Sequence, residues 1–253
     1  MIGKYGSEQL AYFVNFNVLN FFCLVGVILI SSAILSVVSR KKSLFFTGIG
    51  CILLASIYTI FDALFVRVFI GEYNSLIIKI FMPILLSFMT CGFILGLGGS
   101  LYIQAKMEQD GRCSLFSKIT YIFALIGLII TVLFLAFLKN IASYIAIPVE
   151  IFADFTAYSK IALIGGFFGS VQIFFMYFLV AEGKTKLLII SIFLPLLCKI
   201  VFDWAFVVIL KFGMSSSAVS TLASQFIGFL IPFIHFFYGK GKLRLRKMNV
   251  KLD

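Results

Sequence analysis

The chain has 253 residues, of which 62% are hydrophobic and 12% are charged, and its mean hydropathy is +1.15. This composition excludes an ordinary soluble globular domain and indicates a polytopic membrane protein. The net charge of +11 does not point to nucleic acid as a partner, because the lysines and arginines fall mainly between the apolar runs, where they set membrane topology.

Seven apolar runs are long enough to cross a bilayer as helices, which satisfy their backbone hydrogen bonds within the segment. They cover about residues 10–38, 44–69, 76–103, 119–138, 158–180, 187–210 and 218–238. We expect two long loops between them, at residues 106–118 and 139–157, the second with a short amphipathic piece. Small residues at 96–100 permit close helix contact or local bending in the third run. The sequence therefore predicts an all-α integral membrane protein with about seven spans.

Positive charge gathers on alternate loops. Fourteen lysines and arginines fall in the loops after the first, third and fifth runs and in the tail, whereas six fall on the opposite side. The positive-inside rule then predicts an outer N-terminus and a cytoplasmic C-terminus. We interpret the basic tail as a topology anchor on anionic lipid, and we expect no removable signal peptide at the N-terminus. The expected location is the plasma membrane of a bacterium.

Two acids lie inside these runs, Asp62 in the second and Asp203 in the sixth. A charged side chain at the centre of a membrane helix costs about 2.5–3.5 kcal/mol on insertion scales, so it normally faces protein or a watery cavity. The alternative is an acid held neutral, or bonded to a neighbouring helix for assembly alone. At 1.5 Å per residue, both acids lie in the outer half of the bilayer, as do Thr221 and Gln225. We hypothesise that these four groups share a cavity.

Lys199 lies four residues before Asp203, so the two share a helix face and can form an ion pair. Simple neutralisation of one by the other remains an open alternative, and Asp62 would then be the main titratable acid. His235, near the inner end of the last run, is interpreted as an interface histidine rather than a proton relay. Five scattered cysteines and one histidine support neither a disulfide framework nor a metal site, and no catalytic constellation indicates an enzyme.

Four stretches occur in the order of a known family pattern. Residues 56–62 read SIYTIFD and are followed by FV at 65–66 and FIG at 69–71. These resemble the first-helix pattern S-L-Y-N-x-x-D-x-x-F-V-G of multidrug and toxic compound extrusion (MATE) transporters. The glycine-rich residues 96–100 are similar to the family's second helix, and FLVAEG at 178–183 resembles its F-L-R-A-E-G. Asp203 and residues 221–225 resemble the acid of the fifth helix and the A-T-x-x-S-Q of the sixth.

The resemblance implies export of amphipathic, often cationic compounds in exchange for H⁺ or Na⁺, with no other cofactor. The matching acids are Asp62 and Asp203, and the matching polar residues of the cation-linked site are Thr221 and Gln225. Tyr58 and Lys199 are expected to modulate the site, and Lys199 stands where the family usually has asparagine, so its ammonium group would take the place of the cation.

Family members have twelve helices in two lobes, whereas this chain resembles one lobe. The expected parts are an extra N-terminal helix in residues 1–43, a six-helix lobe in 44–238, and a basic tail in 239–253 that resembles an inter-lobe linker. We expect a half-size transporter that acts when paired, as a homodimer or with a separate half. The alternatives are a truncated, non-transporting membrane protein and a lipid-linked oligosaccharide flippase. The expected partners are the bilayer and a small amphipathic or cationic substrate.

Overall fold

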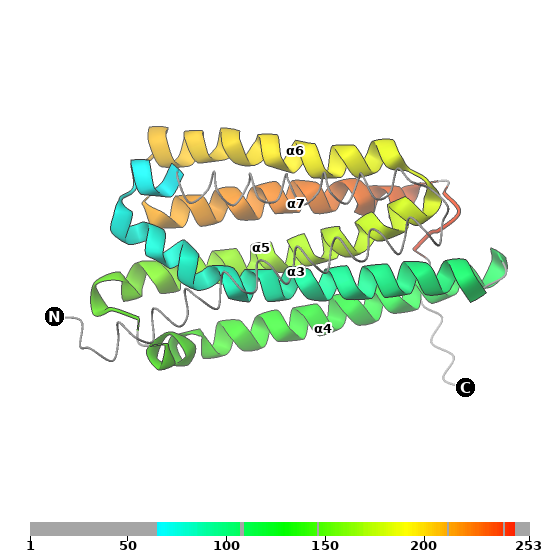
Figure 1. Ribbon diagram of the computed structural model, residues 1–253, viewed down its shortest axis with the longest axis horizontal. Helices are drawn as coiled ribbons and strands as arrows, with labels where there is room; N and C mark the ends of the chain where they lie inside the picture. Colours follow the sequence, from blue (N-terminus) through cyan, green and yellow to red (C-terminus); the bar gives the residue numbers. More distant parts are fainter. Residues whose placement is uncertain (1–64, 107–108, 146, 212, 240, 246–253) are drawn as a thin grey trace.

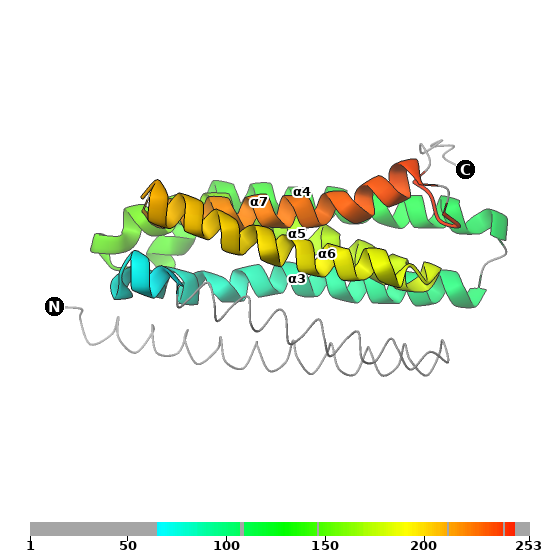
Figure 2. The ribbon, with the colours of Figure 1, turned by 90° about the horizontal axis from the view of Figure 1, so that it is seen from above.

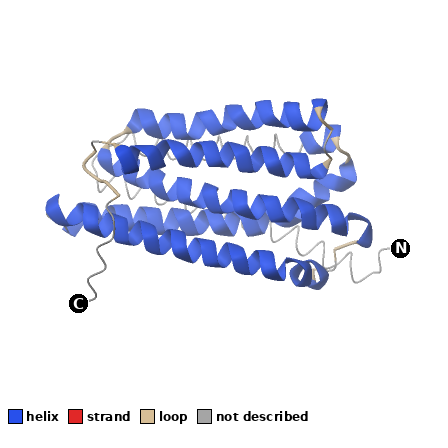
Figure 3. Cartoon of the chain, turned by 180° about the vertical axis from the view of Figure 1, so that it is seen from behind, coloured by secondary structure: helices blue, strands red, loops and turns tan. Residues whose placement is uncertain are grey.

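The computed structural model describes residues 65–106, 109–145, 147–211, 213–239 and 241–245. Helices build this part of the chain, and strands are absent from these residues. The helices are α3 (Glu72–Lys106), α4 (Gln109–Tyr144), α5 (Val149–Glu182), α6 (Thr185–Asp203), the π-helix η1 (Trp204–Ile209) and α7 (Met214–Tyr238). They lie side by side as one elongated bundle with short connections at the two ends (Figures 1 and 3). The predicted run 10–38 and most of the run 44–69 lie outside the described residues.

Five helical segments are long and apolar enough to cross a membrane. They are Leu76–Ala105, Gly111–Tyr144, Val149–Glu182, Thr185–Ile209 and Met214–Tyr238. The prediction of membrane-length helices is thus confirmed for the last five runs. The end of the bundle at which α5 ends and α6 begins is called the inner end below, after the predicted topology.

The two predicted long loops are wrong. Residues 106–118 lie mostly in helix, since α3 ends at Lys106 and α4 begins at Gln109. α4 then continues to Tyr144, and α5 begins at Val149, directly after Pro148 with a φ of −54°. The fixed φ of proline suits the start of a helix. Charged residues show where the chain reaches water, but they do not show where a helix ends. Hydropathy therefore predicted helices that are shorter than α4 and α5.

α5 is the central helix of the described bundle and lies between α3 and α7 (Figures 1 and 2). Its approach to α3 requires glycine, because a Cβ atom on Gly92 would lie 2.1 Å from the carbonyl oxygen of Ser170. A Cβ atom on Gly96 would lie 2.9 Å from the Cα atom of Phe174, whereas one on Gly98 would meet open space. The predicted close helix contact within residues 96–100 is therefore confirmed at Gly96.

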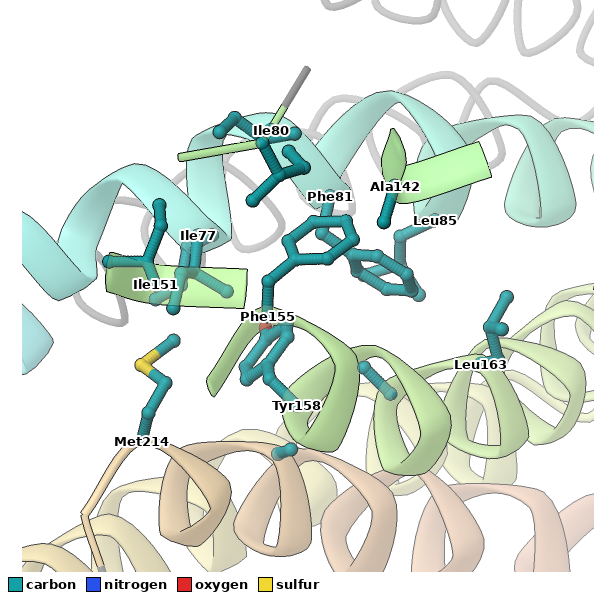
Figure 4. Close-up of a cluster of buried hydrophobic side chains, with 14 of the residues drawn as sticks. Ile77, Ile80, Phe81, Leu85, Ala142, Ile151, Phe155, Tyr158, Leu163 and Met214 are labelled. Atoms are coloured by element: carbon teal, nitrogen blue, oxygen red, sulfur yellow. The ribbon is translucent and has the colours of Figure 1, made fainter. Parts of the chain in front are cut away.

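The apolar core has two parts. Near the outer end, α3, α5 and the start of α7 meet in a cluster that includes Ile77, Phe81, Phe155, Tyr158 and Met214 (Figure 4). Near the inner end, α4, α5 and α7 meet in an aromatic cluster that includes Phe116, Phe174, Phe175, Phe178 and Phe236. Interlocked aromatic rings of this kind fix helix positions, since offset and edge-on contacts have defined geometry. The polar groups described next lie on a scaffold that these clusters hold in place.

Candidate functional site

The predicted ion pair within α6 is confirmed. The Nζ atom of Lys199 lies 2.6 Å from Oδ1 and 2.7 Å from Oδ2 of Asp203. The two side chains are 1% and 0% exposed, respectively. Their spacing of four residues places them one helical turn apart on the same face. Both oxygens of Asp203 are thus bonded to a cation that the protein itself supplies.

Ser220 of α7 completes this cluster and joins α6 to α7. Its hydroxyl oxygen accepts a hydrogen bond from Lys199 Nζ at 2.9 Å and donates to Oδ1 of Asp203, and the residue is fully buried. Burying two charges costs more than their attraction returns unless further hydrogen bonds satisfy the remaining polar atoms. Ser220 supplies such bonds. We refer to Lys199, Asp203 and Ser220 as the ion-pair cluster.

The other predicted site residues of α7 have different surroundings. Thr221 is buried, and its hydroxyl donates to the carbonyl oxygen of Ser217 on the same helix at 2.9 Å. Gln225 lies against α5, where a Cβ atom on Gly165 would come within 3.0 Å of its Oε1 atom. That oxygen is buried and has no hydrogen-bond partner among the described residues. Asp62 and Tyr58 lie outside the described residues, so their roles remain predictions.

The sequence reasoning missed Ser220, although a signal was present. Serines at 217, 220 and 224 repeat at helical spacing and form a polar stripe along an apolar helix. A stripe of this kind predicts a polar contact with a neighbouring helix. It does not identify that helix, and the partner on α6 became evident from the fold.

A π-helix follows the ion pair directly. α6 ends at Asp203, and η1 covers Trp204–Ile209, where the amide of Leu210 donates to the carbonyl oxygen of Ala205 at 3.0 Å. A π-turn adds one residue to the helical repeat and is often found beside functional sites. Within η1, Trp204 is 57% exposed, whereas Val207, four residues after Asp203, is buried. The ion pair thus lies at the last regular turn of α6.

A second buried carboxylate lies at the inner end of the bundle. Oε2 of Glu182, at the end of α5, lies 2.7 Å from Nε2 of His235 on α7, and the two side chains are 2% and 12% exposed. The amide of Leu243 donates to Oε1 at 2.5 Å. His235 therefore joins two helices, as the interpretation of an interface histidine requires. We refer to Glu182, His235 and Leu243 as the inner cluster.

Further bonds hold the C-terminal segment, residues 241–245, against the same end (Figure 1). The hydroxyl of Ser117 on α4 donates to the carbonyl oxygen of Arg244 at 3.3 Å, and the amide of Leu245 donates to that of Phe236 at 2.9 Å. The segment therefore contacts α4, α5 and α7. Among the described residues, no group of three or more histidine, cysteine or acidic side chains could hold a metal ion.

The described helices define an all-α, multi-pass membrane protein. No protein-family model matches the sequence, and no curated protein matches it. A solved structure of a MATE protein in a bent conformation is similar, with a TM-score of 0.71 and 16% identity over 94% of this chain and 50% of that one. An outward-facing multidrug resistance MATE transporter of the MOP superfamily gives a TM-score of 0.70 and 20% identity over 78% of this chain and 44% of that one. The structure of a MATE mutant gives a TM-score of 0.70 and 20% identity over 77% of this chain and 44% of that one. The expected MATE-like fold is thus confirmed, over about half the length of these transporters.

Proposed function

We propose that this chain is a half-size MATE-like secondary transporter that exports amphipathic or cationic compounds in exchange for H⁺ or Na⁺. The observation that carries the proposal is the MATE-like fold over most of the chain together with a buried, fully bonded carboxylate on α6. Charged groups buried at membrane depth are expensive and commonly mark ion or substrate pathways. In this proposal the ion-pair cluster belongs to such a pathway.

The proposal assigns ion coupling to Asp62. Lys199 already bonds both oxygens of Asp203, so an incoming cation would have to displace a tethered ammonium group from that acid. Asp62, on the predicted second run, is the other acid that the sequence places at a similar depth. Loading a cation on Asp62 would change the local charge and bias an alternating-access equilibrium. Asp203 would then help to shape the site without exchanging its own ion.

Transport in reconstituted vesicles tests this assignment. The full chain would be incorporated into liposomes, and efflux of a fluorescent lipophilic cation would be followed under an imposed H⁺ or Na⁺ gradient. We expect gradient-dependent efflux from the wild-type chain and its loss in Asp62→Asn. Glu150→Gln, which changes an exposed acid in the first turn of α5, is the matched control and should transport normally. If the wild-type chain shows no gradient-dependent efflux, the result would instead favour a non-transporting membrane protein.

Pairing is tested separately by mass. The chain covers 50% and 44% of the transporters named above, so the proposal requires a second lobe to complete a translocation path. Light scattering in nanodiscs, corrected for lipid, should give a dimer or a complex with a protein of similar size. A strict monomer that still transports would overturn the pairing and leave the coupling assignment standing.

A further inference from the structure

α6 contains a proline in its interior. Pro195 lies within the helix Thr185–Asp203, four residues before Lys199. Proline has no amide hydrogen, so the carbonyl group four residues earlier loses its ordinary helical donor. That carbonyl belongs to Ser191, a fully buried residue. A buried carbonyl without a donor is costly, so another group is expected to bond to it.

Gln172 of α5 supplies the missing donor. Its side-chain Nε2 atom donates to the carbonyl oxygen of Ser191 at 2.6 Å. The hydroxyl of Ser191 is engaged elsewhere, because it donates to the carbonyl oxygen of Leu187 on its own helix at 2.8 Å. The bond from Gln172 therefore crosses from one helix to the next at the point where the proline interrupts the backbone ladder.

A glycine of α7 leaves room for the same amide group. A Cβ atom on Gly228 would lie 2.5 Å from Oε1 and 2.6 Å from Nε2 of Gln172. Gly228 itself lies four residues before Pro232, the proline inside α7. The amide of Gln172 thus lies beside the proline-interrupted turns of both α6 and α7.

We infer that Gln172 is a positioning residue that fixes the helix geometry of α6 at Pro195 and so places Lys199 and Asp203 against Ser220. Pro195 divides α6 into an inner part that follows Lys184 and an outer part that carries the ion pair. A proline is a common site of helix bending, because the ladder is broken and the ring displaces the preceding turn. The hydrogen bond from Gln172 of α5 to Ser191 holds the two parts of α6 at one angle to each other. Its consequence for transport rests on the proposed function, whereas the structural role does not.

A double-mutant cycle with Pro195→Ala tests the structural role. Gln172→Leu removes the donor, and in the proline background it should lower the apparent melting temperature of the purified chain by about 4 °C. The Pro195→Ala substitution would restore the backbone amide that satisfies the Ser191 carbonyl. Gln172→Leu should therefore lower the apparent melting temperature much less in the Pro195→Ala background than in the proline background. Equal losses in the two backgrounds would overturn the inference.

Distances between spin labels provide a readout that a general loss of stability would not reproduce. Labels would be placed at two exposed positions, Ile209 beyond the ion pair and Lys160 on α5, in a chain whose five native cysteines are replaced. Gln172→Leu should broaden the distance distribution, and Gln172→Leu with Pro195→Ala should narrow it again. An unchanged distribution in Gln172→Leu would also overturn the inference.

Two further variants keep the test decisive. Gln104→Leu is the matched control, because the amide of Gln104 donates within α3 to the carbonyl oxygen of Ser100 at 3.3 Å, and its loss should leave the label distances unchanged. Gly228→Ala displaces the amide of Gln172 without removing it and should reproduce the broadening. Gln172→Leu could fail to fold when proline is present at position 195 and yet fold when Pro195→Ala is added. That rescue would support the inference. Neither the melting temperature nor the label distances depend on transport. A failure of the proposed function would therefore be seen in the liposome experiment and not in these two measurements.

Discussion

The described part of the bundle holds two buried carboxylates, and their surroundings differ. Asp203 bonds a full cation from its own helix one turn away, with Ser220 of the next helix as a third member. Glu182 bonds a histidine ring from α7 and a backbone amide from the C-terminal segment. Asp203 is thus satisfied mainly by local sequence, whereas Glu182 is satisfied by residues 53 and 61 positions away.

The difference follows from position. Asp203 lies inside a membrane-length segment, where a charge needs a partner within the protein. Glu182 lies at the C-terminus of α5, where the partial negative charge of the helix dipole disfavours a carboxylate. External donors from His235 and Leu243 offset that disadvantage. The ion-pair cluster therefore depends on charge balance, and the inner cluster depends on the docking of a distant segment.

Removing one member of the ion pair should have the largest effect. Lys199→Met or Asp203→Leu leaves the other charge buried without its partner, which typically costs about 3–5 kcal/mol. The double variant Lys199→Met with Asp203→Leu removes both charges and should cost much less than the sum. Reversible unfolding in mixed detergent measures each stability. Lys160→Met, which changes an exposed lysine of α5, is the control, and additive losses in the double variant would contradict a mutual pairing.

A change in the inner cluster should loosen the C-terminal segment that it holds, without unfolding the bundle. Glu182→Gln keeps the shape of the side chain but removes its charge. Hydrogen bonds to a charged group are worth about 1.5–3 kcal/mol, roughly twice as much as neutral ones, so the variant should weaken these bonds. The loss should appear as faster hydrogen exchange at the amides of Leu243 and Leu245, by about tenfold or more. Glu150→Gln at the exposed start of the same helix should leave both rates unchanged. Fast exchange in the wild-type chain would show that the segment is not held by Glu182.

The four-residue spacing of Lys199 and Asp203 explains why the sequence predicted their ion pair but not the third member of the cluster, Ser220. A lysine and an aspartate four residues apart in an apolar helix predict their own ion pair. Glu182 and His235 lie on different helices, and their contact depends on how α5 packs against α7. The bond from Gln172 to Ser191 is hidden for the same reason, although Pro195 shows from the sequence that a donor is missing. Asp62 and Tyr58 stay predictions, because they lie outside the described residues.

The helix boundaries show the same division between local and distant information. Apolar runs predicted the number of helices in the described part, because crossing a membrane requires about 20 apolar residues. They did not predict where α4 begins or ends, since helices extend beyond the apolar core into water. The shared cavity of Asp62, Asp203, Thr221 and Gln225 remains a hypothesis. Among the described residues, the hydroxyl of Thr221 bonds to Ser217 of its own helix, and the amide of Gln225 lies against α5.

The inner cluster depends on the position of α5, because Glu182 lies on that helix, and the contact between α5 and α3 can be tested directly. Gly92→Ala would force a methyl group against the Ser170 carbonyl, and overpacking of this kind costs about 1–3 kcal/mol. Gly98→Ala, on the same helix but beside open space, should be nearly neutral. Unfolding measured by the same method compares the two variants. Equal stability of both would show that α3 and α5 can separate at little cost.

Ser220→Ala should have the smallest effect and separates charge from hydrogen bonding within the ion-pair cluster. The ammonium group of Lys199 has three donors, of which two reach Asp203 and the third reaches Ser220. Loss of the hydroxyl leaves the opposite charges in contact, so we expect about 1 kcal/mol of destabilisation. The coupling energy between Lys199 and Asp203 should then remain close to its original value.

Ser224→Ala is the matched control, because the hydroxyl of Ser224 donates within its own helix to the carbonyl oxygen of Thr221 at 2.9 Å. A loss in Ser220→Ala as large as that in Lys199→Met would mean that the serine is needed to keep the pair assembled. The contact between α6 and α7, rather than the spacing within α6, would then be what makes a buried charge tolerable at this depth. In that case Asp203 would resemble Glu182 in depending on a neighbouring element, and the contrast between the two carboxylates would reduce to the identity of the donor.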